Sequence, residues 1–94
     1  MLSRIPIVLD KVEQKDLNKE ILRAAIIAEM DAISLYEQMA DLTDNYEVRR
    51  VLLDVAKEEK THVGEFQALL LEQDEEQMKE LEAGKMEVDE ELQK

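Results

Sequence analysis

The residues of this sequence that could do chemistry together are Glu59 and His62, which form a Glu-x-x-His motif within residues 51–71. The pattern of this stretch is strongly helical, and residues three apart lie on the same face of a helix. That face is otherwise apolar, with Val55 before the motif and Phe66 and Leu69 after it. Placing a carboxylate and an imidazole on such a face is costly unless something pairs them. A transition metal would pair them, because carboxylate oxygen and imidazole nitrogen are good ligands for iron, manganese or zinc.

A third candidate ligand, Glu29, interrupts the apolar stripe of the other long periodic segment, residues 17–42. The break between the two segments falls near residues 43–46, so we expect an antiparallel helical hairpin. In such a hairpin Glu29 lies level with about position 60. Glu29, Glu59 and His62 are therefore predicted to occupy one layer, within about one helical turn of each other.

Each of these residues also has an interpretation without chemistry. A lone histidine on an apolar face is more often a satisfied core histidine, but two carboxylates at its level favour a metal. Tyr36, on the stripe of Glu29, fits a core tyrosine and a hydrogen-bond donor beside a metal centre equally well. Asp31 falls on a face that reads as solvated, together with Glu37.

Length and composition indicate a single all-α domain over residues 1–94. The 94 residues include two glycines, one proline and no cysteine, and helix formers dominate. Within the acidic C-terminal segment (residues 75–94), a short helix over residues 75–83 is predicted to end at Gly84. Asp16 and Asp44 are the expected N-caps of the two long helices. The expected parts are a leader (1–15), a first helix (16–43), a second helix (46–72) and an acidic C-terminal helix or tail (75–94).

The charge and hydropathy of the chain exclude several classes of function. The net charge of −12 argues against nucleic-acid binding, which requires a basic face, and it favours cations or basic partners, or simply solubility. No run approaches the ~20 apolar residues of a membrane span. The absence of cysteine fits a reducing, cytoplasmic setting, and residues 1–9 lack the apolar core of a signal peptide.

Two helices of this kind expose too much apolar surface to form an adequate core alone. A symmetric dimer would bury that surface in a ferritin-like four-helix bundle. The same dimer would bring together two copies each of Glu29, Glu59 and His62, which is the ligand set of a carboxylate-bridged di-iron centre. A structural alternative stays open: a helical-hairpin oligomer whose Glu and His side chains form a static metal site or an ion-paired interface.

The run AEMDAISLYEQ (residues 28–38), followed after a short turn by KEEKTH (57–62), resembles the encapsulated ferritins, especially the archaeal members linked to an encapsulin shell. The resemblance covers residues 17–71 and extends loosely into the acidic tail. It implies a fold, an activity and a set of site residues. The implied ferroxidase ligands, shared between two subunits, are Glu29, Glu59 and His62; Tyr36 matches a tyrosine beside the centre, and Asp31 matches an acidic residue where metal enters at the subunit interface.

The resemblance further implies a ferroxidase that oxidises Fe(II) to Fe(III) with O₂ and supplies iron storage. The chain would act as a homo-oligomer, a ring of five dimers, in the cytoplasm inside an encapsulin nanocompartment. Two features depart from the family pattern. A family glutamate next to the acidic position falls on Ala28, and the usual C-terminal targeting peptide is not evident. Because the targeting peptide is not evident, we expect either a truncated chain or a piece of a fusion with the shell protein.

Overall fold

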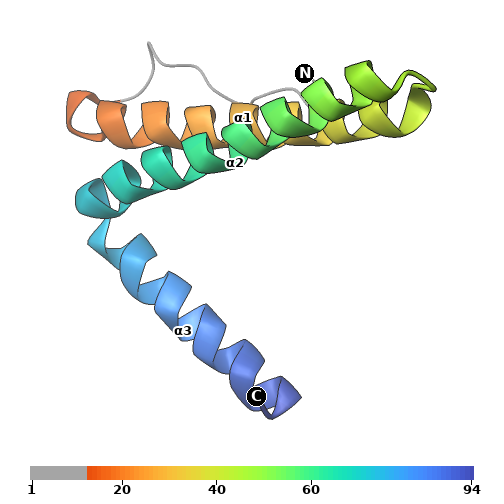
Figure 1. Ribbon diagram of the computed structural model, residues 1–94. Helices are drawn as coiled ribbons and strands as arrows, with labels where there is room; N and C mark the ends of the chain where they lie inside the picture. The colour runs from red at the N-terminus through yellow and green to blue at the C-terminus, as the bar shows by residue number, and fades with distance from the viewer. Residues whose placement is uncertain (1–12) are drawn as a thin grey trace.

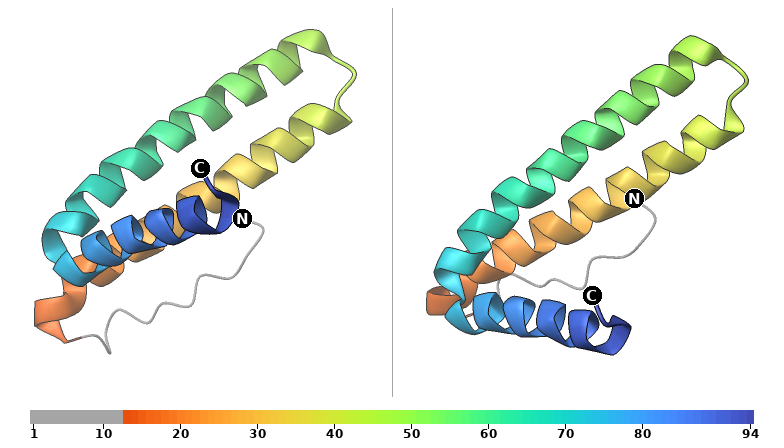
Figure 2. Two further views of the ribbon diagram at one scale, coloured as in Figure 1. Left: turned by 90° about the horizontal axis from the view of Figure 1, so that it is seen from below. Right: turned by 60° about the horizontal axis from the view of Figure 1, so that its bottom comes forward.

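The computed structural model describes residues 13–94, and these residues form helices and turns without a strand. The elements in chain order are a short 3₁₀ helix η2 (Gln14–Asp16), α1 (Leu17–Leu42), α2 (Tyr46–Gln73) and α3 (Glu75–Leu92). Helices α1 and α2 run antiparallel side by side (Figures 1 and 2). This arrangement confirms the all-α class and the helical hairpin. Residues 1–12 of the predicted leader (residues 1–15) lie outside the described residues.

The N-cap residue agrees with the expectation at α1 and differs from it at α2. At α2 the capping side chain belongs to Asn45 rather than Asp44: the Asn45 carboxamide oxygen accepts the backbone N–H of Val48 at 3.0 Å. At α1 the N-cap residue is Asp16, as expected, but its side chain accepts no backbone N–H. It contacts the ammonium group of Lys19 at 3.5 Å instead. Both asparagine and aspartate suit an N-cap, so the pattern located the turn correctly and missed the capping residue by one position.

Arg49 holds the turn between the two long helices. Its Nε donates to the carbonyl oxygen of Ala40 at 3.0 Å, and its Nη2 donates to the carbonyl oxygen of Thr43. The last carbonyl groups of a helix have no partner within the helix. A cation near a helix C-terminus is also favourable because of the helix dipole. Arg49 therefore both completes the end of α1 and ties it to the first turn of α2.

The interior of the hairpin is thin. The described residues that are fully buried and apolar are Ile33 and Ala40 on α1, and Ala56 and Leu70 on α2. Many large apolar side chains remain exposed, among them Ile21, Met30, Val48, Val51 and Leu69. Exposed apolar area on this scale marks surfaces that other chains cover.

Helix α3 leaves the end of α2 at a single linking residue, Asp74, and runs away from the hairpin (Figure 1). It continues through Gly84 to Leu92, so the predicted end of this helix at Gly84 is wrong. Glycine weakens a helix interior by about 1 kcal/mol relative to alanine but does not by itself stop it. The left-handed residue that ends α3 is Gln93, with φ 56° and ψ 43°.

Among the helices that the structure describes, none combines the length and apolar character required to cross a membrane.

Candidate metal centre

Glu29, Glu59 and His62 converge between the two long helices. Glu29 comes from the middle of α1, and Glu59 and His62 come from successive turns of α2. One ligand atom from each side chain lies within 4.8 Å of the other two. His62 Nδ1 lies 3.4 Å from Glu29 Oε2 and 3.5 Å from Glu59 Oε2. The hairpin register thus brings together the three residues that the sequence pattern singled out.

The separations of His62 Nδ1 from the two carboxylates are compatible with ligands around one ion. Ligands bound to one metal ion at about 2.1 Å lie about 3.0–3.5 Å apart, depending on the coordination geometry. A direct N–H···O hydrogen bond is usually shorter, about 2.7–3.2 Å. The 3.4 and 3.5 Å separations of the imidazole nitrogen from the two carboxylates fit the first case better. Two carboxylates with one imidazole also suit iron, manganese or zinc.

The cluster is only partly enclosed. The exposed fraction of the side chain is 20% for Glu29, 18% for Glu59 and 44% for His62. The two carboxylates are thus set between the helices, while the imidazole reaches the surface. A metal ion held here would keep a side open to further ligands, as a reactive site requires.

An apolar row runs through His62 along α2. Val48, Val55, His62 and Leu69 recur every seven residues along α2 and therefore lie on one face. Val48 is 46% exposed and Leu69 is 51% exposed, although both are large apolar side chains. A solvent-exposed apolar row with one imidazole in its middle is typical of a surface that another chain covers.

Tyr36 and Asp31 stand apart from the three converging side chains. Tyr36 lies seven residues after Glu29, on the same face of α1 but about 10 Å further along its axis, and its side chain is partly buried. Asp31 lies two residues after Glu29 and so points to another side of α1. Neither belongs to the group whose ligand atoms converge. Their expected roles, beside the centre and on the path of metal, stay predictions.

The basic residue nearest in sequence to the cluster on α2, Lys60, has a partner outside the cluster. Its ammonium group pairs with the carboxylate of Glu37 on α1 at 2.9 Å. Glu37, which was expected on a solvated face, therefore forms an ion pair between the two helices. In the part of the chain described, no lysine or arginine ion pair is recorded with Glu29 or Glu59, whose carboxylates contact His62.

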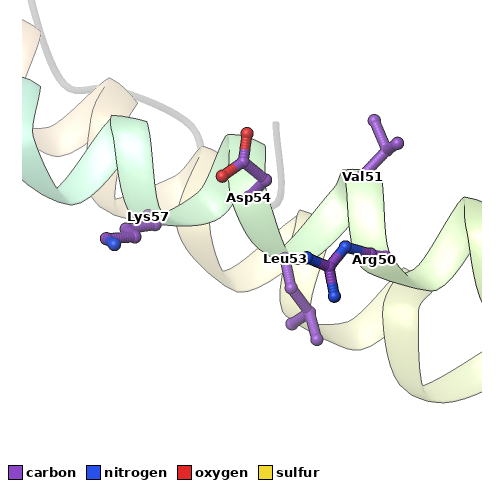
Figure 3. A pocket seen from close by; sticks show the side chains of 5 residues that line it. All are labelled: Arg50, Val51, Leu53, Asp54 and Lys57. Atoms are coloured by element: carbon purple, nitrogen blue, oxygen red, sulfur yellow. The ribbon is translucent and has the colours of Figure 1, made fainter.

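A hollow of about 580 Å³ lies on a different part of α2 (Figure 3). Its lining residues all come from α2 and include none of the candidate ligands. Because the hollow is formed by one helix and offers a single carboxylate beside two basic side chains, it is not a metal site. The lining residues are Arg50, Val51, Leu53, Asp54 and Lys57.

Comparison with known proteins places this geometry in a family. A profile of the Rubrerythrin family matches residues 20–93. The crystal structure of the encapsulated ferritin domain from Pyrococcus furiosus superimposes with a TM-score of 0.81 at 58% identity, covering 96% of this chain and 94% of that one.

Two relatives are longer than this chain. A ferritin-like–encapsulin shell fusion protein of Pyrococcus furiosus is 58% identical over 92 residues, which make up 96% of this chain and 27% of the fusion. The encapsulin nanocompartment cargo protein EncC of Myxococcus xanthus is 39% identical over 67 residues, 71% of this chain and 51% of EncC. The chain thus spans about a quarter of the first relative and about half of the second. By the family profile and the structural match over nearly its full length, the chain belongs to the rubrerythrin family and, within it, to the encapsulated ferritins.

Proposed function

We propose that the protein is a ferroxidase that oxidises Fe(II) with O₂ at a di-iron centre formed by Glu29, Glu59 and His62 of two subunits. The observation that carries this proposal is the convergence of three ligand atoms within 4.8 Å at an exposed apolar face. Membership of the encapsulated ferritins supports an iron-related role.

The ligand count supports a shared centre. One chain supplies two carboxylates and one imidazole, which is too few for two iron ions with a bridge between them. A second chain related by a twofold axis doubles the set. The four carboxylates of the pair carry a formal charge of −4, which two divalent ions balance. The apolar row that contains His62 would then be buried at the twofold interface.

The three side chains suit both oxidation states of the substrate. Each Fe(II) loses one electron, so an iron pair supplies the two electrons that, with two protons, reduce O₂ to hydrogen peroxide. Carboxylates favour the more highly charged Fe(III) product because they are hard anionic ligands. The imidazole of His62 adds a ligand without adding negative charge, and its exposure in the single chain leaves it accessible to a metal shared with a second subunit. Tyr36 would act beside the centre, and Asp31 along the path of metal.

The static alternative predicts the same contacts without turnover. In it, a protonated His62 would bridge the two carboxylates, or zinc would fill the site, and the cluster would only fix the register of the subunits. The long separations argue against a direct ion pair, but they fit a static zinc site and a reactive centre equally well. Oxygen consumption separates the two, because a static centre consumes none.

The test compares Glu59→Ala with Glu58→Ala, which removes the same charge from the exposed neighbouring residue. We expect Glu59→Ala to abolish most Fe(II)-dependent oxygen consumption and Glu58→Ala to retain it, with unchanged helicity in both. Sizing should show smaller species in chelator and larger ones after Fe(II) is restored. Near wild-type oxidation by Glu59→Ala would refute the centre, and an unchanged monomer in both conditions would refute the sharing.

We further propose that the working form lies inside an encapsulin shell in the cytoplasm, as a ring of five dimers. The similarity to a shell fusion protein and to a nanocompartment cargo protein supports a shell partner. Co-expression with the encapsulin of the same organism tests this. Co-elution of the chain at the size of the shell is expected, and elution only at the size of the free oligomer would refute the partnership.

A further inference from the structure

Helix α3 is held in its direction by very little packing. None of its residues is buried, and its large apolar side chains are all substantially exposed. Within residues 13–94, no Cα atom of α3 lies within 8 Å of one in α1. Figures 1 and 2 show α3 diverging from the hairpin at the end of α2. Within a single chain, something other than a hydrophobic core must therefore set the angle at this elbow.

The elbow consists of one residue, Asp74, whose carboxylate has two different partners. Asp74 Oδ1 accepts the backbone N–H of Gln77 at 3.0 Å and so caps the first turn of α3. Asp74 Oδ2 accepts a hydrogen bond from Arg23 Nη2 on α1 at 2.9 Å. The Asp74 side chain is only 12% exposed. One small carboxylate thus joins the start of α3 to the side of α1.

Arg23 is itself oriented for this contact. Its Nη1 donates to Glu20 Oε1 at 2.9 Å, so the two ends of the guanidinium group are held by two carboxylates. A planar guanidinium held in this way is a directional partner, which a lysine would not be. Glu20 precedes Arg23 by three residues on α1 and therefore faces the same side.

We propose that Arg23 and Asp74 form an acid-sensitive latch that fixes the direction in which α3 leaves the hairpin, and that protonation of Asp74 releases α3. We call this pair, with the Gln77 N–H, the elbow latch. It lies apart from Glu29, Glu59 and His62 and does not depend on iron. Its release would redirect a helix that carries an acidic surface and exposed Met78, Leu81 and Val88.

The charges around Asp74 favour the closed latch at neutral pH. The hydrogen bond from the Gln77 N–H lowers the pKa of Asp74 below its ordinary value of 3.8, the charges of Lys19 and Arg23 lower it further, and partial burial opposes them. Glu20 faces this group through Arg23, and no titratable residue of α2 contributes to the shift. A depressed carboxyl pKa means that the contact is fully present above pH 3.8 and is lost as the pH falls through the lowered value.

The absence of cysteine allows a direct measurement of the elbow. We would introduce Lys57→Cys on α2 and Glu87→Cys on α3, both exposed in the wild type, and attach spin labels. Pulsed electron paramagnetic resonance then measures the distance between the labels. An excess of unlabelled chain suppresses distances between subunits, and circular dichroism verifies that the helices persist.

At pH 7 the wild type should give a single narrow distance distribution. Arg23→Ala should broaden this distribution, because the substitution removes the guanidinium group that holds Asp74 to α1 and leaves the cap on α3 in place. Asp74→Asn should broaden it as well, since asparagine keeps an N-cap oxygen but not the charge. Lys85→Ala, which removes an exposed ion pair with Asp89 on α3 away from the elbow, is the matched control and should stay narrow.

Acid should broaden the wild-type distribution below about pH 3.8 and change Asp74→Asn little. Narrow distributions for both Arg23→Ala and Asp74→Asn at pH 7 would overturn the latch. A wild-type distribution that stays narrow in acid, with helicity intact, would overturn the acid release. Where acid melts the helices, the neutral-pH result for Asp74→Asn, the mimic of the protonated residue, decides.

Discussion

Replacing Glu59 by glutamine should make the metal-free protein more stable while it abolishes iron oxidation. Glutamine keeps the shape of the side chain and removes one of two neighbouring negative charges. Ligand oxygens of Glu29 and Glu59 lie within 4.8 Å of each other. At that separation two charges repel by about 3 kcal/mol in an effective dielectric of about 20.

Solvent reduces this figure. The two carboxylates are 20% and 18% exposed, so we expect a net stabilisation of about 1–2 kcal/mol for Glu59→Gln in chelator. For a domain of this size, such a gain raises the melting temperature by roughly 4–16 °C. The measurement is made at one fixed pH and one fixed protein concentration.

The assay is thermal unfolding followed by circular dichroism, in chelator and with Fe(II) under nitrogen. Wild type should be the less stable protein in chelator and the more stable one with Fe(II), so that the order reverses. Glu58→Gln, with the same charge change outside the cluster, should follow the wild type in both conditions. A lower melting temperature for Glu59→Gln in chelator would refute the idea that the empty cluster repels itself.

Three further predictions follow from other parts of the chain. Arg49→Ala should destabilise the hairpin by about 1–2 kcal/mol, because two backbone carbonyl groups lose a charged donor; urea unfolding measures this, and an unchanged midpoint would show that solvent replaces the contact. Gly84→Ala should stabilise α3 by up to about 1 kcal/mol, because a Cβ there would meet nothing within 4 Å; greater helicity on heating is the expected result, and lower helicity would contradict it. Removing residues 75–94 should slow iron oxidation mainly at low salt and low iron, because an acidic surface raises the local cation concentration and salt screens this attraction. A loss of oxidation rate and of particle mass at every salt concentration would instead assign the segment to assembly.

The hairpin was predictable because its evidence is local and repeated. Apolar residues at helical spacing and one polar break near residues 43–46 fix two helices and, with them, the register between the two helices of the hairpin. That register placed Glu29 level with about position 60, and the structure puts it 3.4 Å from His62. The proximity of the ligands is therefore found, while their role as iron ligands stays a prediction.

The elbow and the end of α3 could not be read in the same way. The Arg23–Asp74 contact joins residues 51 positions apart, and no local pattern reveals it. Gly84 looked like a helix end because glycine is the usual left-handed residue there. In the structure this conformation falls to Gln93, since a glycine inside a helix weakens it without forcing an end. Asp74 did offer a signal, an aspartate three residues before Gln77 in a strongly helical context.

The thin interior of the hairpin has a consequence for how the protein folds. With so few side chains fully buried, a single chain gains little from folding, and most of its stabilisation must come from contact with a second chain. Folding should then be second order, and the unfolding midpoint should rise with protein concentration. Tethering many copies to one another, as fusion to a shell-forming domain would do, replaces a dilute encounter by a high effective concentration. The same sequence could thus be marginal when free and fully folded when tethered.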